Sequence, residues 1–200
     1  SRTDSIFTSQ KSKVVIFDTE QAPLYCKKTI QRIGSLSGDY SNIKYYSLKK
    51  YNIKMKMFVI EKALKKHNPK MIVIDNAADL VNDINDNKET AIFKAFLMRI
   101  QATYSLHTCL VIHTNKNDDN IRGAIGAEID RVIETNIMLK EITDSKTHSE
   151  IIFKKTRDSI KPNNEQITVR NNFAVIDRGE ISNDKFVEEK HNNFRFLNSQ

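Results

Sequence analysis

The sequence has little cysteine and no long apolar run, and these absences exclude several classes of protein. Its two cysteines form no C-x-x-C pair and have no metal-ligand spacing, so neither a disulfide scaffold nor a cysteine-ligated metal site is expected. No apolar run approaches the roughly 20 residues of a membrane span, and no signal sequence appears. We therefore expect a cytoplasmic chain with reduced thiols and no membrane partner, and we expect Cys109 to lie in the core.

The charge balance of the chain is strongly positive. Its 200 residues carry a formal net charge of +7, and 39% of them are hydrophobic. That length suits one ordinary domain, and the positive charge favours an anionic partner, of which nucleic acid is the usual one. A well-solvated basic protein without such a partner is the alternative. Because Ser1 is not an initiator Met, we expect a fragment, a processed chain or the ordered part of something longer.

Strand and helix patterns alternate along the first two thirds of the chain and give way to strands alone. We expect α/β architecture, a mostly parallel sheet flanked by helices, with antiparallel C-terminal strands as an extension. One helix carries apolar residues at 3–4 spacing, as a core-facing stripe requires: Ile92, Phe93, Phe96, Leu97 and Ile100. Strands are expected at 13–17, 43–47, 71–75, 108–112, 135–141, 149–155, 165–170 and 173–177. Helices are expected from Pro23 to about Gly34, and at 52–67, 88–105 and 125–133.

Two of the apolar strands end on carboxylates. Val14 to Phe17 leads directly into Asp18-Thr19-Glu20, and Met71 to Ile74 leads directly into Asp75. Buried parallel strands of this kind deliver their last residues to one edge of an α/β sheet. Two acids at neighbouring strand ends suit a Mg-nucleotide site, where one holds the metal's water shell and one polarises a water. The G-x-x-x-x-G-K-[ST] phosphate loop, however, occurs nowhere in these residues.

These strand ends, in the order in which they occur along the chain, resemble those of the RecA-like ATPase family, especially its hexameric-helicase and plasmid- or transposon-borne branches. The resemblance covers roughly residues 13–177 and implies ATP and Mg²⁺ as cofactors. It implies that Glu20 activates the attacking water and contacts the nucleotide, and that Asp75 positions Mg²⁺ through water. It also implies that His113, at the end of the next strand, senses the γ-phosphate.

The resemblance extends to contacts with DNA and with a neighbouring subunit. It implies that the loop from Lys116 to Gly126, including Arg122, touches DNA. The Lys155-Thr156-Arg157 run matches a K-x-R whose Lys155 and Arg157 reach the nucleotide of the adjacent subunit in a ring or filament. Softer likenesses, Asp79 to Asn85 and Arg122 to Gly126, point to ATPases of mobilisable transposons and plasmids of Bacteroides-type bacteria.

In the family, the phosphate loop lies about two dozen residues before the catalytic glutamate. That position falls just before Ser1 or within the first few residues, and Ser1-Arg2-Thr3-Asp4 shows no trace of it. We expect residues 1–180 to form a single RecA-like core without that loop, inactive on its own, and 181–200 to form a charged tail.

Each of these roles has a structural alternative. Asp18, Thr19 and Glu20 suit the start of a helix, and Asp75 could be held by local backbone donors. His113 could be structural, and Arg157 could be an ordinary charge on a hairpin. The lysine-rich helix from Asn52 to His67, including Lys56, could neutralise nucleic-acid phosphates or could simply be a solvated face.

Tyr45 and Tyr46 beside that helix suggest base stacking, although strand alternation turns one of them into the core.

The leading hypothesis is therefore an ATPase core that couples ATP hydrolysis to DNA binding or remodelling, as a homo-oligomeric ring or filament, in mobile-element mobilisation or replication. A non-catalytic DNA-binding or assembly module with the same fold is the alternative. A phosphotransferase or signalling ATPase that ignores nucleic acid is a weaker one.

Overall fold

The computed structural model describes most of the chain between Ser12 and Ile176. The described residues are 12–37, 41–114, 121, 123–142, 148–157, 160–170 and 173–176. The chain divides into two compact units, Ser1–Ile133 and Glu134–Gln200, which are described separately below.

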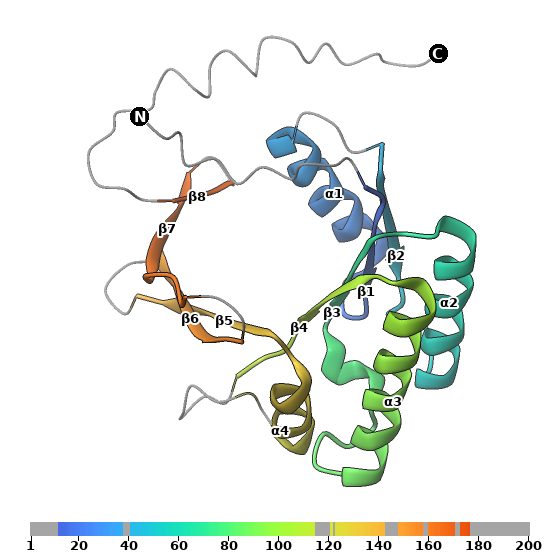
Figure 1. The fold of residues 1–200 in the computed structure, drawn as a ribbon. Coiled ribbons are helices and arrows are strands. Elements are labelled where there is room, and N and C mark those ends of the chain that lie inside the picture. Colours follow the sequence, from blue (N-terminus) through green and yellow to red (C-terminus); the bar gives the residue numbers. More distant parts are fainter. Residues whose placement is uncertain are drawn as a thin grey trace, which may run out of the picture. The chain divides into compact units, whose positions relative to one another are not determined.

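The first unit is built on a four-stranded sheet whose strands are all parallel (Figure 1). Its spatial order is β2-β1-β3-β4. The strands are β1 (Val14–Asp18), β2 (Ile43–Ser47), β3 (Met71–Asp75) and β4 (His107–Val111). The helices are α1 (Pro23–Ser37), α2 (Ile53–His67), the 3₁₀ helix η1 (Ala77–Leu80), α3 (Asn87–Tyr104) and α4 (Gly123–Val132). The helices and strands begin and end close to the residues expected from the sequence, and their arrangement confirms the predicted fold class.

Local signals in the sequence fix where α2 begins and ends. The side chain of Asn52 accepts a hydrogen bond from the Met55 amide and caps the first turn. At the other end Asn68 adopts a left-handed conformation with φ of 43°, and its amide donates to the carbonyl of Leu64. Pro69 follows, so the chain leaves the helix and enters β3 after one further residue.

Helices cover both faces of the sheet, and α2 and α3 lie on the face opposite to α1 (Figure 1). Val15, Phe17, Ile72 and Ile74 point to the α2–α3 face and are fully buried there with residues of both helices. The predicted stripe on α3 is confirmed at Phe93, Phe96, Leu97 and Ile100. Ile92 is an exception, because its side chain is 63% exposed and packs into no core.

The expectation that Cys109 lies in the core is wrong. Its side chain is exposed, because β4 alternates exposed and partly buried positions instead of being covered on both faces. Cys26, on α1, is the buried cysteine.

The second unit is a separate four-stranded antiparallel sheet in the order β5-β6-β7-β8. Its strands are β5 (Thr135–Glu141), β6 (His148–Thr156), β7 (Glu165–Arg170) and β8 (Phe173–Ile176). The antiparallel strands were predicted correctly, but they pair with one another and do not extend the parallel sheet. The single core over 1–180 stays a prediction, and the predicted tail at 181–200 lies outside the described residues.

None of the helices in the described part of the chain has both the length and the hydropathy needed to cross a bilayer.

Candidate functional site

The two predicted acidic strand ends meet at the carboxyl edge of the parallel sheet. β1 and β3 are hydrogen-bonded neighbours, and their register places Asp18 directly beside Asp75. One further backbone hydrogen bond joins them just beyond β1, where the amide of Thr19 donates to the carbonyl of Asp75 at 2.6 Å. The acids therefore come from adjacent strands and share one edge, as the strand pattern predicted.

Asp18 shapes the turn that follows β1. Its fully buried carboxylate accepts hydrogen bonds from the amides of Glu20 (3.0 Å) and Gln21 (2.7 Å), and from the hydroxyl of Tyr45 (2.6 Å). Burial, and then the bond to Asp18, raise the pKa of the Tyr45 hydroxyl, so it remains a donor. Because α1 begins only at Pro23, Asp18 holds the turn before the helix and projects Glu20 beyond the strand.

Thr19 joins this turn to the one after β3. Its hydroxyl, buried within the protein, accepts from the amide of Asn76 at 2.9 Å. The same hydroxyl lies 3.0 Å from the Asn76 carbonyl and 2.9 Å from an Asp79 carboxylate oxygen, between which its single hydrogen is shared. Lys56 secures the second turn, because its ammonium donates to the carbonyl of Asp79 at 3.2 Å.

Glu20 extends from the first turn and has two polar neighbours. The Asn76 side-chain amide donates to its Oε1 at 3.1 Å, and the Nε2 of His113 lies 3.5 Å from the same oxygen. Both side chains remain open to solvent, at 44% exposed for Glu20 and 70% for His113. The carboxylate is thus held on one side and open to solvent on the other, so a water molecule could come within hydrogen-bond reach of it.

The surroundings of Asp75 disfavour the ionised form of its carboxyl group. Burial, and then the nearby carboxylates of Asp18 and Glu20, raise its pKa, and His113 opposes them. No hydrogen bond or ion pair to its carboxylate is found among the described residues. The structural alternative, an Asp75 held by local backbone donors, therefore has no support there. A nearby cation would compensate a desolvated carboxylate beside two other acids.

A family model described as an AAA domain matches residues 3–119, more than half of the chain. The chain belongs to the AAA domain family. A crystal structure of a KaiC-like protein from the hyperthermophilic archaeon Pyrococcus horikoshii is similar in fold, with a TM-score of 0.58 at 14% identity. That match covers 82% of this chain and 76% of the other. The comparison with curated proteins gave no match. Family and fold together support a RecA-like ATPase core.

ATPases of the AAA and RecA-like families generally use ATP and Mg²⁺. The donor set of this AAA domain fits Mg²⁺ better than a metal enclosed by protein ligands. Among the described residues no group of three or more His, Cys, Asp or Glu side chains could enclose a metal ion. Mg²⁺ needs no such group, because it keeps several waters and takes one or two carboxylates together with substrate phosphates. Asp75 could supply such a carboxylate, and Mg²⁺ held there would neutralise phosphate charge.

The remaining predicted site residues of the AAA domain belong either to the second unit or to parts of the chain that the structure does not describe. Lys155 is on β6, and Arg157 follows the strand, with its amide donating to the carbonyl of Glu134. Both therefore belong to the second unit, and their reach to a nucleotide stays a prediction. Lys116 and Arg122 lie outside the described residues.

Sequence reasoning missed Asn76, which directly follows Asp75 and holds Glu20. The sequence did contain a signal for Asn76, because a polar residue directly after a strand that ends in an acid lies at the same sheet edge as the acid that ends the neighbouring strand. Reasoning also misplaced Lys56, which was grouped with the possible phosphate-binding lysines of its helix. It is instead buried, and it pairs with Asp79.

Neither tyrosine of β2 is left for base stacking. Tyr45 donates to Asp18, whereas Tyr46 stacks on Phe17 and its hydroxyl lies 2.7 Å from the Nε2 of His67. The idea that these tyrosines stack on bases therefore finds no support in the fold.

Proposed function

We propose that this AAA domain is the core of an ATPase that couples ATP hydrolysis to binding or remodelling of DNA. The observation that carries the proposal is the shared edge at which Glu20 and Asp75 come together. Their proximity appears in the geometry of the two joined turns and in the contribution of Glu20 to the raised pKa of Asp75. A base and a metal-facing acid on adjacent strands are what water attack on a phosphoryl group needs.

Each residue has a distinct part in the proposed reaction. Glu20 orients the attacking water and accepts its proton, while Asn76 keeps its carboxylate aimed. Asp75 holds Mg²⁺ through water and thereby helps to bind the nucleotide. His113, which touches Glu20, hydrogen-bonds to the γ-phosphate and responds to its loss.

The oligomer, the DNA partner and the biological role are further parts of the proposal. Lys155 and Arg157 act on the nucleotide of an adjacent subunit in a ring or filament, where a cation at the transferring phosphate raises the rate by about 10³–10⁵. Lys116 and Arg122 contact DNA, and the charge of +7 supports an anionic partner. Mobilisation or replication of a mobile element, in a helicase-like manner, is the role we propose.

Substitution of Glu20 by glutamine tests the proposal. The protein made from its complete coding sequence is assayed for ATP hydrolysis with and without DNA, and for binding of a fluorescent ATP analogue with Mg²⁺. Glu20→Gln is expected to abolish hydrolysis and to leave nucleotide binding within about twofold, because the amide keeps the shape but accepts no proton. Glu61→Gln, at the exposed pair with Arg99, is the control and is expected to keep full activity. Full hydrolysis by Glu20→Gln would remove Glu20 from the reaction.

A non-catalytic DNA-binding or assembly module is the second candidate. It is favoured by the contacts of Glu20 with Asn76 and His113, which would also suit a purely structural carboxylate. A wild-type protein that binds DNA and ATP analogue but hydrolyses nothing would decide for this candidate.

A further inference from the structure

The positive charge of the chain is concentrated in one quarter of its sequence. Residues 21–70 contain twelve Lys or Arg and only two Asp or Glu, whereas the other 150 residues contain twenty and twenty-three. The rest of the chain is therefore slightly acidic. Such asymmetry indicates a localised anion-binding surface, which an evenly basic protein would not have.

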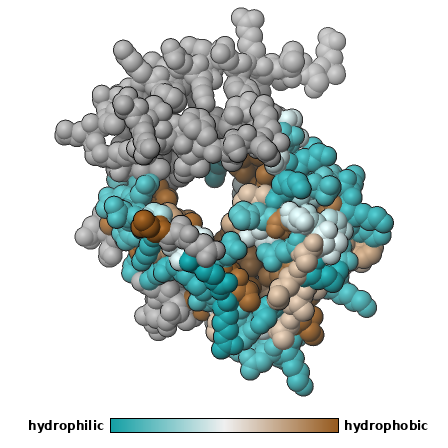
Figure 2. All heavy atoms as spheres, in the orientation of Figure 1, coloured by the Kyte–Doolittle hydropathy of each residue, from teal (hydrophilic) through white to brown (hydrophobic). Residues whose placement is uncertain are grey.

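The fold gathers four of these twelve cations on the outer side of α2. Four exposed lysines, together with two large exposed apolar side chains, form what we call the α2 basic face: Lys54, Lys62, Lys65, Lys66, Met55 and Phe58. Lys56 points the opposite way, into the protein. Hydrophilic side chains project along this side of the molecule in Figure 2.

Among the described residues, the lysines of the α2 basic face have no carboxylate as a counterion. Glu61 is the one acid of α2, and it is engaged by Arg99 of α3. Within the described ranges no carboxylate forms an ion pair with the four lysines. Lys62 lies over the ring of Phe58, 5.2 Å from its centroid. The face therefore presents uncompensated ammonium groups to solvent.

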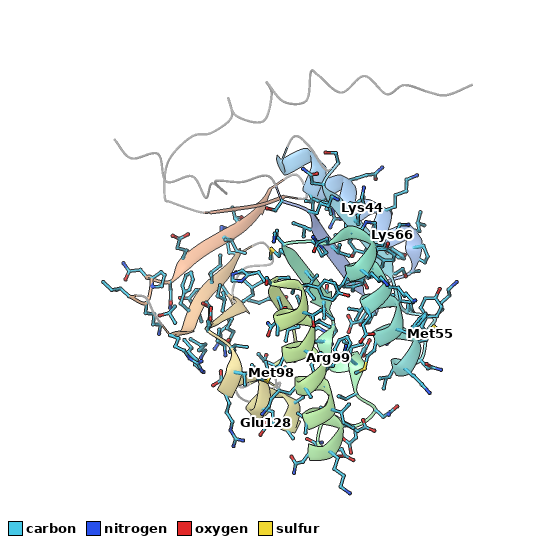
Figure 3. The ribbon with its side chains drawn as sticks, turned by 45° about the vertical axis from the view of Figure 1, so that its right-hand side comes forward. Lys44, Met55, Lys66, Met98, Arg99 and Glu128 are labelled. Atoms are coloured by element: carbon cyan, nitrogen blue, oxygen red, sulfur yellow. The ribbon has the colours of Figure 1, made fainter. Side chains whose placement is uncertain are left out.

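More positive charge adjoins the C-terminal end of the helix. Lys44 of β2 and Lys66 lie near one another there, whereas Met55 marks the other end of α2 (Figure 3). His67 responds to this crowding, since burial first, and then Lys66, Lys44 and Lys13, lower its pKa. Ammonium groups that repel a proton from a neighbouring imidazole would attract a phosphate to the same place.

We propose that the α2 basic face binds the phosphate backbone of nucleic acid. This inference rests on the proposed function for its choice of partner and adds a contact surface on the outer side of α2. The four lysines span three turns of one helix, which suits successive phosphates along a strand. An anionic membrane surface fits less well, because only Met55 and Phe58 are available to insert and lysines surround them.

Matched double substitutions test the location of binding. Lys62→Gln with Lys65→Gln removes two charges from the α2 basic face. Lys27→Gln with Lys28→Gln removes two charges, also exposed, from α1 on the opposite face of the sheet. Binding of fluorescein-labelled DNA, single strand and duplex, is followed by anisotropy between 50 and 300 mM salt, and thermal melting verifies that each variant is folded. These measurements need no ATP hydrolysis.

The α2 pair is expected to weaken binding at least about tenfold at low salt and to reduce the slope of log K against log[salt] by about 1.5–2. The α1 pair is expected to change the binding free energy and the salt slope by no more than about a third of the changes caused by the α2 pair. Equal losses in both variants would mean diffuse attraction and would overturn the proposed surface. Wild-type binding that the α2 pair leaves intact would overturn the surface and leave the proposed function standing. A wild type that binds phosphatidylserine vesicles but no DNA would overturn both the surface and the DNA part of the proposed function.

Discussion

Removal of the Thr19 hydroxyl is expected to destabilise the protein well beyond the usual cost of losing one hydroxyl. Thr19→Val keeps the shape of the side chain, which is only 3% exposed. It deprives the buried Asn76 amide of its acceptor at 2.9 Å and removes the contact with Asp79. An unsatisfied buried donor costs about 1–3 kcal/mol, and the lost bond to a partly exposed carboxylate adds about 0.5–1 kcal/mol. We expect a total of about 2–3 kcal/mol.

Thr90→Val is the matched control for this substitution. The Thr90 side chain is also fully buried, but its hydroxyl only donates to the carbonyl of Asp86, at 2.8 Å. That carbonyl already accepts from the Thr90 amide at 3.0 Å, so valine leaves no group unpaired. Valine and threonine have similar helix propensities, so we expect a loss below about 1 kcal/mol.

Thermal and urea unfolding at pH 7, followed by circular dichroism, compare the two variants with the wild type. At about 2–4 °C per kcal/mol for a chain of this size, Thr19→Val is expected to lower Tm by about 4–12 °C. Thr90→Val is expected to lower it by less than about 4 °C. Equal losses in the two variants would refute the argument that Thr19 joins the turns by accepting the Asn76 amide.

Three further substitutions probe the same unit. The buried hydroxyl of Thr108 has no hydrogen-bond partner among the described residues, so Thr108→Val is expected to raise Tm slightly or leave it unchanged, and a clear fall would reveal a missing partner. Asp75→Asn is expected to raise Tm at pH 7, because an acid whose pKa is raised in the folded state costs stability once it is ionised. The gain in Tm should vanish toward about pH 4, near the pKa of an aspartate in the unfolded chain. A gain that stays constant with pH would point to another cause. Phe93→Ala, fully buried, is expected to cost about 3–5 kcal/mol in urea unfolding, whereas Ile92→Ala one position earlier should cost under about 0.5 kcal/mol; similar costs would contradict the burial pattern.

Much of the fold of this AAA domain was readable from local signals. The sequence predicted the lysine-rich helix at 52–67, and the structure has it at Ile53–His67. Agreement is this close because Asn52 and Pro69 are capping and breaking residues whose effect needs no distant partner. The apolar runs that end in Asp18 and Asp75 likewise predicted two buried strands and the edge that both acids reach.

Local patterns were less informative where burial depends on what covers a surface. Cys109 and Ile92 both belong to apolar patterns, and both are exposed. Lys56 lies in a run of lysines but is buried, because the turn after β3 supplies a carbonyl and a carboxylate for its ammonium. Hydropathy along the chain carries no information about such partners.

The sequence by itself determined which residues form strands and helices, which acids end the strands, and where the positive charge is concentrated. These properties follow from side-chain chemistry within a few residues. Only the tertiary structure decided that Asn76 holds Glu20, that Thr19 joins the two turns, and that the C-terminal strands form a sheet of their own. The reason is physical, because strand register and pairing bring together groups more than fifty residues apart, and hydrogen bonds form only between groups that the fold has already made neighbours.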